Sequence, residues 1–349
     1  MQLGDIEYVS LIDLANAFLQ VEVAPEDRHK LSFVTRSGKY EYTRCCFGLR
    51  NSPTQFARLI NHVLSNLHPM HRIMSYLDDI LCVDIDLKSH LASLRALWGL
   101  LRKYNLKIQP DKIELLKRSV IFLGHKLSKG GIQVDENKVM AIAKMPPPKD
   151  VTGVRRFIGA ASYYRKFIPE FSIVAQPLFE LIKKDKPFLW SEETNESFEK
   201  LKTLLCSAPV LVYPDFSKPD TFIIFVDSSI KGVSATLTQG TPEESKAVCY
   251  KSRTLNSAER NYPSIHREVL ALVFGVTSFH SYIAYTPFTL VTDCRPLIYL
   301  HNTPLNNTCY RLVKWKLILM QYQFKLVHKP GTSRCMALVD MLSRLEEHP

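Results

Sequence analysis

The spacing of apolar residues changes several times along the first third of the chain, which predicts alternating strands and helices. Residues 8–14 (YVSLIDL) form an apolar run typical of a buried strand. Apolar residues recur every three or four positions over 51–67 and 87–104, which predicts two helices. Between them, residues 73–84 carry two apolar arms around an acidic turn, which predicts a hairpin. We interpret residues 1–127 as a first domain.

The middle of the chain is predicted to be helical. Three consecutive prolines at 146–148 break the pattern. An amphipathic helix is expected to follow at 152–168, with basic side chains off its apolar face. Another helix is expected over 192–206. We interpret residues 128–215 as a separate, mainly helical segment.

Prolines at 209, 214 and 219 punctuate a short linker, and the pattern then changes to strands. The predicted strands are 221–227, 233–238, 247–251 and 288–292. One long helix, at 263–281, interrupts them. These elements place a domain boundary near 210–220 and define a last domain over 216–349. The fold class is therefore α/β in both the first and the last domain.

The composition is that of an ordinary water-soluble globular protein, with 46% hydrophobic and 23% charged residues. Nothing approaches the run of ~20 apolar residues that spans a bilayer, and the first ten residues do not resemble a secretory signal. The eight cysteines form no paired CxxC set with zinc spacing, so reduced thiols in an intracellular protein are expected.

The positive charge is concentrated in one part of the chain. The whole sequence carries a formal net charge of +11, and residues 102–169 hold 15 Lys or Arg against 5 Asp or Glu. Such a block predicts a surface for a phosphate backbone. A solvated helix surface is the alternative that charge alone leaves open.

A first group of carboxylates lies at predicted strand ends. Asp13 ends the first strand, and Asp78 and Asp79 lie in the turn of the predicted hairpin. Three carboxylates brought together there would repel one another unless a cation neutralised them. Two magnesium ions held in this way can activate an attacking hydroxyl and stabilise a departing pyrophosphate. A turn cap is the preferred alternative for Asp13 alone, but not for the adjacent pair, because two carboxylates between apolar arms are costly to desolvate.

A second group of carboxylates lies in the last domain. Asp227 and Asp293 each end a predicted strand, Glu268 lies within the predicted long helix, and Asp340 is expected on a last helix. Strand-end carboxylates beside a helix carboxylate can chelate two metal ions, one activating water and one stabilising a leaving 3′-oxygen. Taken singly, Glu268 is also compatible with a solvated helix position, Asp227 with a turn cap and Asp293 with a plain strand end.

Sequence motifs link each group of carboxylates to a particular class of enzyme. In the first, the segments 10–20 (SLIDLANAFLQ), 47–56 (FGLRNSPTQF), 76–79 (YLDD) and 122–125 (FLGH) stand in the order found in reverse transcriptases. In the last domain, 226–239, 259–276, 288–300 and 330–345 resemble an RNase H domain. Both halves resemble most the gypsy-type LTR retrotransposon branch. The resemblance implies polymerase metal ligands at Asp13, Asp78 and Asp79, and RNase H catalytic acids at Asp227, Glu268, Asp293 and Asp340.

The resemblance also implies roles around the first group. Phe18 falls where the family keeps an aromatic gate against the ribose 2′-hydroxyl, and core packing is an alternative that does not exclude this role. Gly48 begins a stretch that lies near the incoming nucleotide and template in the family. Residues 122–125 match the loop that grips the primer end. The basic stretch 126–185 corresponds to the thumb, which follows the duplex backbone.

Several residues near the second group are weaker candidates for a functional role. Many RNase H domains use a histidine before the last acid to help metal or product leave, and His328 is the nearby candidate. It lies in a strand-like stretch, so a surface strand position is preferred. Tyr262 and Arg260 precede the catalytic helix and could touch substrate, whereas Trp315 and Trp190 are expected to pack.

Together, the residues and the resemblance predict an RNA-directed DNA polymerase joined to a ribonuclease H. The expected fold is an antiparallel palm sheet with helices, a helical thumb, and an RNase H-like mixed five-stranded sheet with flanking helices. The expected cofactor is Mg²⁺, with Mn²⁺ as an alternative and two ions per active site. The expected partners are an RNA template, a DNA primer, an RNA–DNA hybrid and dNTPs, with no membrane. The expected location is the cytoplasm, in a virus-like particle for a mobile element, with the nucleus as an alternative.

Two rival interpretations remain at this point. In the family, a fingers region precedes the first catalytic aspartate and holds the nucleotide triphosphate, so little or no DNA synthesis is expected from this chain alone. One rival is an inactive or domesticated remnant that binds nucleic acid. The other is an RNase H-like nuclease whose first half serves as a platform for the hybrid.

Overall fold

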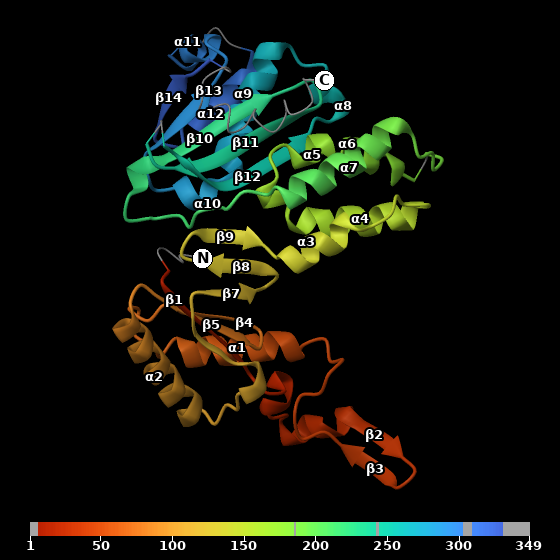
Figure 1. The fold of residues 1–349 in the computed structure, drawn as a ribbon, viewed down its shortest axis with the longest axis vertical. Coiled ribbons are helices and arrows are strands. Elements are labelled where there is room, and N and C mark those ends of the chain that lie inside the picture. The colour runs from red at the N-terminus through yellow and green to blue at the C-terminus, as the bar shows by residue number, and fades with distance from the viewer. Residues whose placement is uncertain (1–5, 185, 242–243, 303–308, 331–349) are drawn as a thin grey trace. The chain divides into compact units, whose positions relative to one another are not determined.

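The structure is a computed structural model that describes residues 6–184, 186–241, 244–302 and 309–330. It divides into two compact units, one ending at Lys129 and the other beginning at Gly130 (Figure 1). The boundary predicted near residue 215 is a finer division and stays a prediction. No helix among the described residues is long and apolar enough to cross a membrane.

The first unit is built on a four-stranded antiparallel sheet in the order β4–β5–β1–β6. Its strands are β1 (Tyr8–Asp13), β4 (Ile73–Tyr76), β5 (Asp79–Asp84) and β6 (Glu114–Lys117). The strand predicted at 8–14 and the hairpin predicted at 73–84 are both confirmed. The antiparallel sheet expected for this domain is confirmed with them.

Two helices, α1 (Ser52–Leu64) and α2 (Leu87–Lys103), share one core with this sheet. Phe56 and Leu97 are completely buried there, since each helix presents one apolar face to this core. The Asp86 side chain caps α2 by accepting a hydrogen bond from the Ser89 amide. Both helices were predicted, and each begins within a residue of its predicted start.

Shorter elements complete the first unit. They are η1 (Ala17–Gln20), η2 (Pro25–Leu31), β2 (Ser32–Thr35), β3 (Gly38–Glu41), η3 (Pro110–Lys112), β7 (Ser119–Phe122) and β8 (His125–Ser128). Strands β2 and β3 form one antiparallel hairpin, and β7 and β8 form another. The short 3-10 helix η3 holds Lys112 beside the end of β1.

The second unit contains a five-stranded mixed sheet in the order β12–β11–β10–β13–β14. The strands are β10 (Phe222–Ser228), β11 (Gly232–Gln239), β12 (Lys246–Thr254), β13 (Phe288–Thr292) and β14 (Phe324–His328). The first three are antiparallel, and β13 and β14 continue parallel to β10. The predicted mixed five-stranded sheet is therefore confirmed.

The other elements of the second unit, one strand and several helices, lie before and between these five strands in the sequence. Before the sheet come β9 (Gly131–Val134), α3 (Glu136–Ala143), α4 (Val151–Tyr163), η4 (Arg165–Phe167), α5 (Phe171–Val174), α6 (Gln176–Leu181), α7 (Glu192–Cys206) and η5 (Pro219–Thr221). Within it come α8 (Ser257–Arg260), α9 (Ser264–Ser278), α10 (His280–Ile283), α11 (Pro296–Asn302) and α12 (Tyr310–Leu319). The helix predicted at 192–206 is confirmed as α7.

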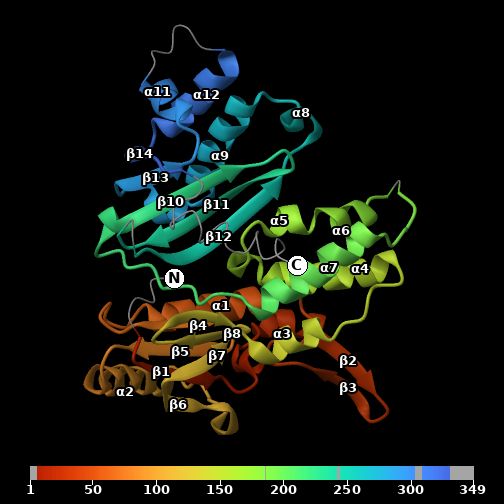
Figure 2. The same ribbon diagram turned by 45° about the horizontal axis from the view of Figure 1, so that its top comes forward.

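Helices cover one face of the central strands and contact the edge strand β12. Helix α9 packs on β10 and β11, and Gly275 permits a close approach because a Cβ there would lie 2.7 Å from Val226 Cγ1. The edge strand β12 contacts η4 and α5, and α5 lies beside it in Figure 2. There the carbonyl of Ser252 accepts hydrogen bonds from Arg165 Nη2 at 3.0 Å and from the Ser172 hydroxyl at 2.8 Å. These contacts explain why the preceding helices and the sheet form one unit.

Three predicted helices end earlier than the sequence pattern suggests, and the first of them, predicted at 51–67, stops at Leu64. The helix predicted at 152–168 stops at Tyr163, and the helix predicted at 263–281 stops at Ser278. The following residues, Tyr164 and Phe279, leave the helical conformation with ψ of 11° and 15°, and both rings are buried. An apolar residue that continues the pattern can therefore turn the chain into the core instead of extending the helix.

Candidate active sites

The first acidic site consists of Asp13, Asp78 and Asp79 at one end of the antiparallel sheet. Asp13 ends β1 and Asp79 begins β5, and the two residues are directly paired across these strands. Asp78 lies in the turn between β4 and β5, and its carbonyl oxygen accepts a hydrogen bond from the Leu14 amide at 2.9 Å. The predicted carboxylates are thus brought together by the hairpin and by its pairing with β1.

The carboxylates of this site repel one another. Burial raises the pKa of Asp79, and the nearby charges of Asp78 and Asp13 raise it further, while Lys112 lowers it. Lys112 Nζ lies 3.4 Å from Asp13 Oδ2, and its side chain is 66% exposed. Three carboxylates beside one exposed ammonium leave an excess of negative charge, so these residues fit the binding of divalent cations.

Phe18 and Gly48 lie near the first acidic site in sequence and have different surroundings. The Phe18 ring, on η1, makes edge contacts with the rings of Phe47 and Phe56, with centroids 5.6 and 6.2 Å apart. Core packing of Phe18 is therefore observed, and a gate against the 2′-hydroxyl stays a prediction. Gly48 has φ of +90°, a conformation that favours glycine, and open space around it.

The segment predicted to grip the primer end forms the tight turn of the β7–β8 hairpin. Its two central residues, Leu123 and Gly124, have φ of 48° and 65°. Two successive positive φ values are characteristic of the type I′ turns that join antiparallel strands. The contact with a primer stays a prediction.

The second acidic site consists of Asp227, Glu268 and Asp293. Asp227 is the penultimate residue of β10, and Asp293 directly follows β13. Because β10 and β13 are parallel and Phe225 pairs with Val291, continuing that register by two residues places Asp293 beside Asp227. Glu268 comes from α9, which packs on β10. The structure thus brings three of the four predicted acids together, and Asp340 lies outside the described residues.

Glu268 has the most perturbed environment in this site. Burial raises the pKa of its carboxyl to about 7, and the charges of Asp293 and Asp227 act in the same direction. The hydroxyl of Ser228 opposes the shift by donating a hydrogen bond to Glu268 Oε1 at 2.7 Å. The other oxygen, Oε2, is buried and has no hydrogen-bond partner among the described residues.

A buried carboxylate oxygen that has no hydrogen-bond partner among the described residues, with two further carboxylates nearby, fits the binding of a divalent cation. Burial of an ionised carboxylate without a partner is costly, and a cation would supply the missing interaction. Asp227, Glu268 and Asp293 offer only oxygen ligands, which Mg²⁺ and Mn²⁺ prefer. The sequence predicted these acids but did not identify Ser228, because a serine at a strand end has no distinctive spacing.

His328 lies closer to the second acidic site than its sequence position indicated. It ends β14 and pairs with Thr292, which confirms the strand position. Its Nε2 lies 3.0 Å from the carbonyl oxygen of Asp293. The parallel pairing of β13 and β14 produces this contact, and neither strand alone could have shown it. Trp315 and Trp190 border the two hydrophobic cores of the unit, as predicted.

The raised pKa of Glu268 predicts that magnesium stabilises the chain more at high pH. Without metal, folding takes up a proton between the ordinary pKa of about 4.5 and the folded value of about 7. The free energy of unfolding therefore falls as pH rises through this window, and above it the full penalty of the ionised Glu268 remains without further change with pH. A bound cation removes this penalty, so Mg²⁺ should raise the melting temperature more near about pH 8 than near about pH 5.5.

Melting curves with Mg²⁺ and with a chelator at both pH values measure this effect. In Glu268→Gln, the pH dependence of the magnesium effect should be reduced, because the glutamine cannot ionise. Equal stabilisation by Mg²⁺ at both pH values in the parent chain would contradict the prediction.

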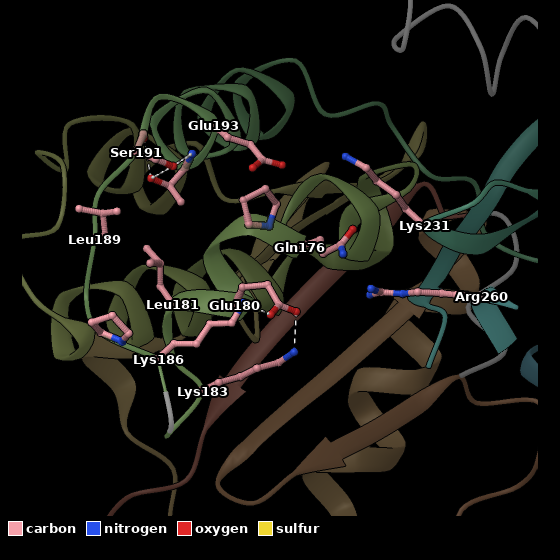
Figure 3. A pocket seen from close by; sticks show the side chains of 13 residues that line it. Gln176, Glu180, Leu181, Lys183, Lys186, Leu189, Ser191, Glu193, Lys231 and Arg260 are labelled. Carbon is pink, nitrogen blue, oxygen red and sulfur yellow. Dashed lines mark hydrogen bonds and ion pairs between the residues drawn. The ribbon is translucent and has the colours of Figure 1, made fainter. Parts of the chain in front are cut away.

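A cavity of about 560 Å³ in the second unit has a mainly basic charged lining (Figure 3). The charged lining residues are Lys183, Lys186, Lys231, Arg260, Glu180 and Glu193. Lys183 and Lys186 each lie within 2.9 Å of Glu180. Lys231 and Arg260 point across the cavity from the opposite wall. Lys231 lies in the β10–β11 turn that begins after Ser228, so the cavity adjoins the segment that carries the second acidic site.

Comparison with protein families identifies the class of both segments. Residues 1–127 match the family described as reverse transcriptase (RNA-dependent DNA polymerase). Residues 190–290 match the family described as an RNase H-like domain found in reverse transcriptase. The chain therefore carries a reverse transcriptase domain followed by an RNase H-like domain, as the motifs predicted. Domains of these two classes generally use divalent metals.

Its homologues are retrovirus-related Pol polyproteins from transposons. The chain is 39% identical over 347 residues to the polyprotein from transposon 297 of Drosophila melanogaster, covering 99% of this chain and 32% of the relative. It is 33% identical to the polyprotein from transposon gypsy of the same species, covering 98% of this chain and 33% of the relative. The chain thus spans about a third of the length of these relatives.

Solved structures show the same fold at low sequence identity. The foamy viral protease–reverse transcriptase in complex with double-stranded DNA matches with a TM-score of 0.82 and 20% identity, over 95% of this chain and 70% of that chain. Its structure in complex with an RNA/DNA hybrid matches with a TM-score of 0.78 and 20% identity, over 96% of this chain and 45% of that one. The predicted α/β fold is confirmed by these likenesses.

Proposed function

We propose that the second unit cleaves the RNA strand of RNA–DNA hybrids with divalent metal ions. The observation that carries this proposal is the buried Glu268 oxygen, which has no hydrogen-bond partner within the described part of the chain and lies near the aspartates at two parallel strand ends. Asp227, Glu268 and Asp293 would hold two Mg²⁺ ions, with Mn²⁺ as an alternative, and Asp340 is proposed as a further ligand. When bound, such ions activate water and stabilise the leaving 3′-oxygen.

The residues around the acids have supporting roles. The Ser228 hydroxyl donates to Glu268 Oε1, which orients the carboxyl and leaves the buried Oε2 available to a cation. This hydrogen bond also favours the ionised carboxylate, the form that binds a cation. His328 contacts the Asp293 backbone at the strand end, and a part in metal or product release remains a proposal for it.

We also propose that the first acidic site is the metal site of an RNA-directed DNA polymerase acting on an RNA template, a DNA primer and dNTPs. Asp13, Asp78 and Asp79 converge with an excess of negative charge, which supports the binding of two divalent ions. Phe18 would exclude ribonucleotides by its size, and Gly48 would lie near the incoming nucleotide. Because the chain spans about a third of its relatives, synthesis is proposed for the whole polyprotein.

The direct test of the nuclease is cleavage of a labelled RNA–DNA hybrid by the purified chain with Mg²⁺. We expect cleavage of the RNA strand within the hybrid, loss of cleavage in a chelator, and no cleavage of the same RNA when single-stranded. A chain that binds the hybrid and leaves it intact would be a nucleic-acid-binding remnant, and the nuclease proposal would be wrong.

The basic cavity predicts where the substrate backbone binds. Lys231 and Arg260 point into it from the end of the sheet that carries Asp227, and two phosphate contacts there would release two counterions. Changing both residues to Ala should weaken hybrid binding and lower the slope of log affinity against log salt by about two. Fluorescence anisotropy with a labelled hybrid at several salt concentrations measures both quantities.

A matched control uses two exposed lysines of the same unit that do not line the cavity. Lys246→Ala with Lys325→Ala removes the same charge from β12 and β14. We expect this pair to leave the salt slope within about half a unit of the parent value. If the two double variants lost equal amounts of hybrid affinity, net charge, and not the cavity, would determine binding.

A further inference from the structure

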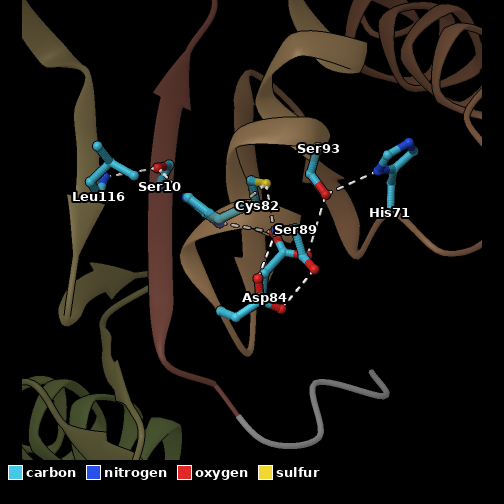
Figure 4. A network of polar contacts seen from close by, with 9 residues as sticks. Ser10, His71, Cys82, Asp84, Ser89, Ser93 and Leu116 are labelled. Atoms are coloured by element: carbon cyan, nitrogen blue, oxygen red, sulfur yellow. Dashed lines mark hydrogen bonds and ion pairs between the residues drawn. The ribbon is translucent and has the colours of Figure 1, made fainter.

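A buried polar network in the first unit joins side chains of β1, β5 and α2 (Figure 4). His90 on α2 lies between two strands. Its Nδ1 is 2.9 Å from Asp84 Oδ2 on β5, and its Nε2 is 2.7 Å from the Ser10 hydroxyl on β1. The side chains of His90 and Asp84 are 0% and 4% exposed, and Ser10 is completely buried.

One assignment of protons satisfies every group in the network. An ionised Asp84 only accepts, so His90 Nδ1 donates to it, and Nε2 of the neutral ring then accepts from the Ser10 hydroxyl. The Ser10 oxygen in turn accepts from the Leu116 amide at 3.0 Å. On the far side of Asp84, Ser93 donates to Oδ1 at 3.3 Å.

The network connects β1 and β5 diagonally. Ser10 pairs with Cys82 in the strand register, yet its hydroxyl is linked through His90 to Asp84, two residues further along β5. The backbone ladder of an antiparallel pair repeats every two residues, so the ladder alone is compatible with a two-residue shift. A diagonal side-chain link is broken by such a shift and therefore fixes how β1 lies along β5.

The same serine also holds the other edge of β1. The register between β1 and β6 shifts between Val9 and Leu11, and Leu116 has φ of 54°. This irregularity turns the Leu116 amide to the Ser10 hydroxyl oxygen. Ser10 therefore satisfies a backbone donor at the irregularity and links β1 to both neighbouring strands.

We propose that Ser10, His90 and Asp84 form a positioning relay for the first acidic site. Three residue pairs along the strands from Ser10 and Cys82, the same register places Asp13 opposite Asp79. By fixing β1 against β5, the relay holds these two carboxylates at the separation needed to share divalent cations. This inference rests on the metal-binding function proposed for the first acidic site, and it assigns His90, Asp84 and Ser10 no contact with substrate.

A metal site at the network itself is the competing interpretation. One ligand atom each from Cys82, Asp84 and His90 lies within 4.8 Å of the others. However, burial and the neighbouring Asp84 carboxylate raise the pKa of the Cys82 thiol, so its ordinary form here is the protonated one. The Cys82 thiol lies 3.6 Å from Asp84 Oδ2 and donates to it, so the network needs no ion to satisfy its groups.

Two serine variants test the relay, because both serines are buried members of the same network. Ser10→Ala removes the link to β1, whereas Ser93→Ala removes a donor to Asp84 on the side away from β1. Both are made in a Glu268→Gln background, which weakens metal binding at the second acidic site. Mn²⁺ binding is measured by electron paramagnetic resonance, and melting temperatures are measured alongside.

We expect Ser10→Ala to raise the Kd for Mn²⁺ by about three- to tenfold, less than the roughly 10- to 100-fold effects of groups that contact metal ligands directly, because Ser10 acts through the strand register. Ser93→Ala should change this Kd less than about twofold, although both variants lower the melting temperature. Ser10→Cys keeps the volume and a weak donor, so its Kd should lie between those of the parent and Ser10→Ala. It also serves as the test if Ser10→Ala does not fold.

Three results would overturn the inference. Unchanged Mn²⁺ affinity in a folded Ser10→Ala or Ser10→Cys would reduce the network to a structural role while leaving the proposed function intact. Mn²⁺ binding that Asp78→Asn does not weaken would remove the proposed metal site, and the relay with it. Stoichiometric zinc in the purified chain, lost in Cys82→Ser, would show that the network is a metal site.

Discussion

Replacing Asp227 by Asn is expected to abolish cleavage of the RNA strand in an RNA–DNA hybrid. The change removes a negative charge from the second acidic site, where Asp227, Glu268 and Asp293 converge. Loss of a ligand to catalytic metal ions costs several kcal/mol of transition-state stabilisation, so we expect a rate at least roughly a thousandfold lower. Initial rates with saturating hybrid and Mg²⁺ measure the loss.

The control for this prediction is Asp220→Asn, the same substitution on an exposed residue just before β10. Its cleavage rate should stay within about twofold of the parent value. Asp227→Asn should also melt no lower than the parent without metal, because it relieves repulsion with Glu268. Cleavage that survives Asp227→Asn would show that the nuclease activity comes from elsewhere or from a contaminant.

Replacing His90 by Ala is expected to destabilise the first unit by about 3–5 kcal/mol. The substitution leaves the buried Asp84 carboxylate without its closest donor and the Ser10 hydroxyl without its acceptor. Breaking a buried charge-assisted pair has a cost of this order because the remaining charge stays desolvated. The empty volume of the imidazole adds to it. Urea titration followed by a probe in the first unit measures the change.

The control for the second prediction is His62→Ala on α1, where the histidine is exposed. We expect a change of about 0.5 kcal/mol or less. Cleavage by the second unit should persist in His90→Ala under conditions in which that unit stays folded, since the network belongs to the first unit. A urea unfolding midpoint in His90→Ala equal to that of the parent would mean that the polar network contributes little to the stability of the first unit.

Much of the fold could be predicted because local patterns and tertiary structure agree. The apolar run at 8–14 forms strand β1, and the residues with helical apolar spacing at 192–206 form helix α7. The pattern failed where a buried aromatic residue ends a helix, as Tyr164 and Phe279 do. Apolar spacing records which residues are buried, but it does not distinguish a further helical turn from a bend into the core.

The candidate sites could be predicted as far as sequence motifs extend. The family motifs pointed to Asp13, Asp227 and Glu268, and the structure places each of them in an acidic site. The roles of the supporting groups depend on pairing between distant segments, which no motif records. Ser10 meets His90 only because α2 packs against β1 and β5, and this contact joins residues 80 positions apart.

The docking of η4 and α5 on β12 affects how the chain can be divided. β12 is an edge strand of the five-stranded sheet, and the Ser252 carbonyl on it is occupied by Arg165 and Ser172. A fragment beginning at residue 216 would uncover this edge, and open edges recruit strands from other molecules and promote aggregation. A fragment beginning at Gly130 keeps the edge covered. A fragment that carries the second acidic site is therefore expected to stay soluble only if it includes the helices that precede the sheet.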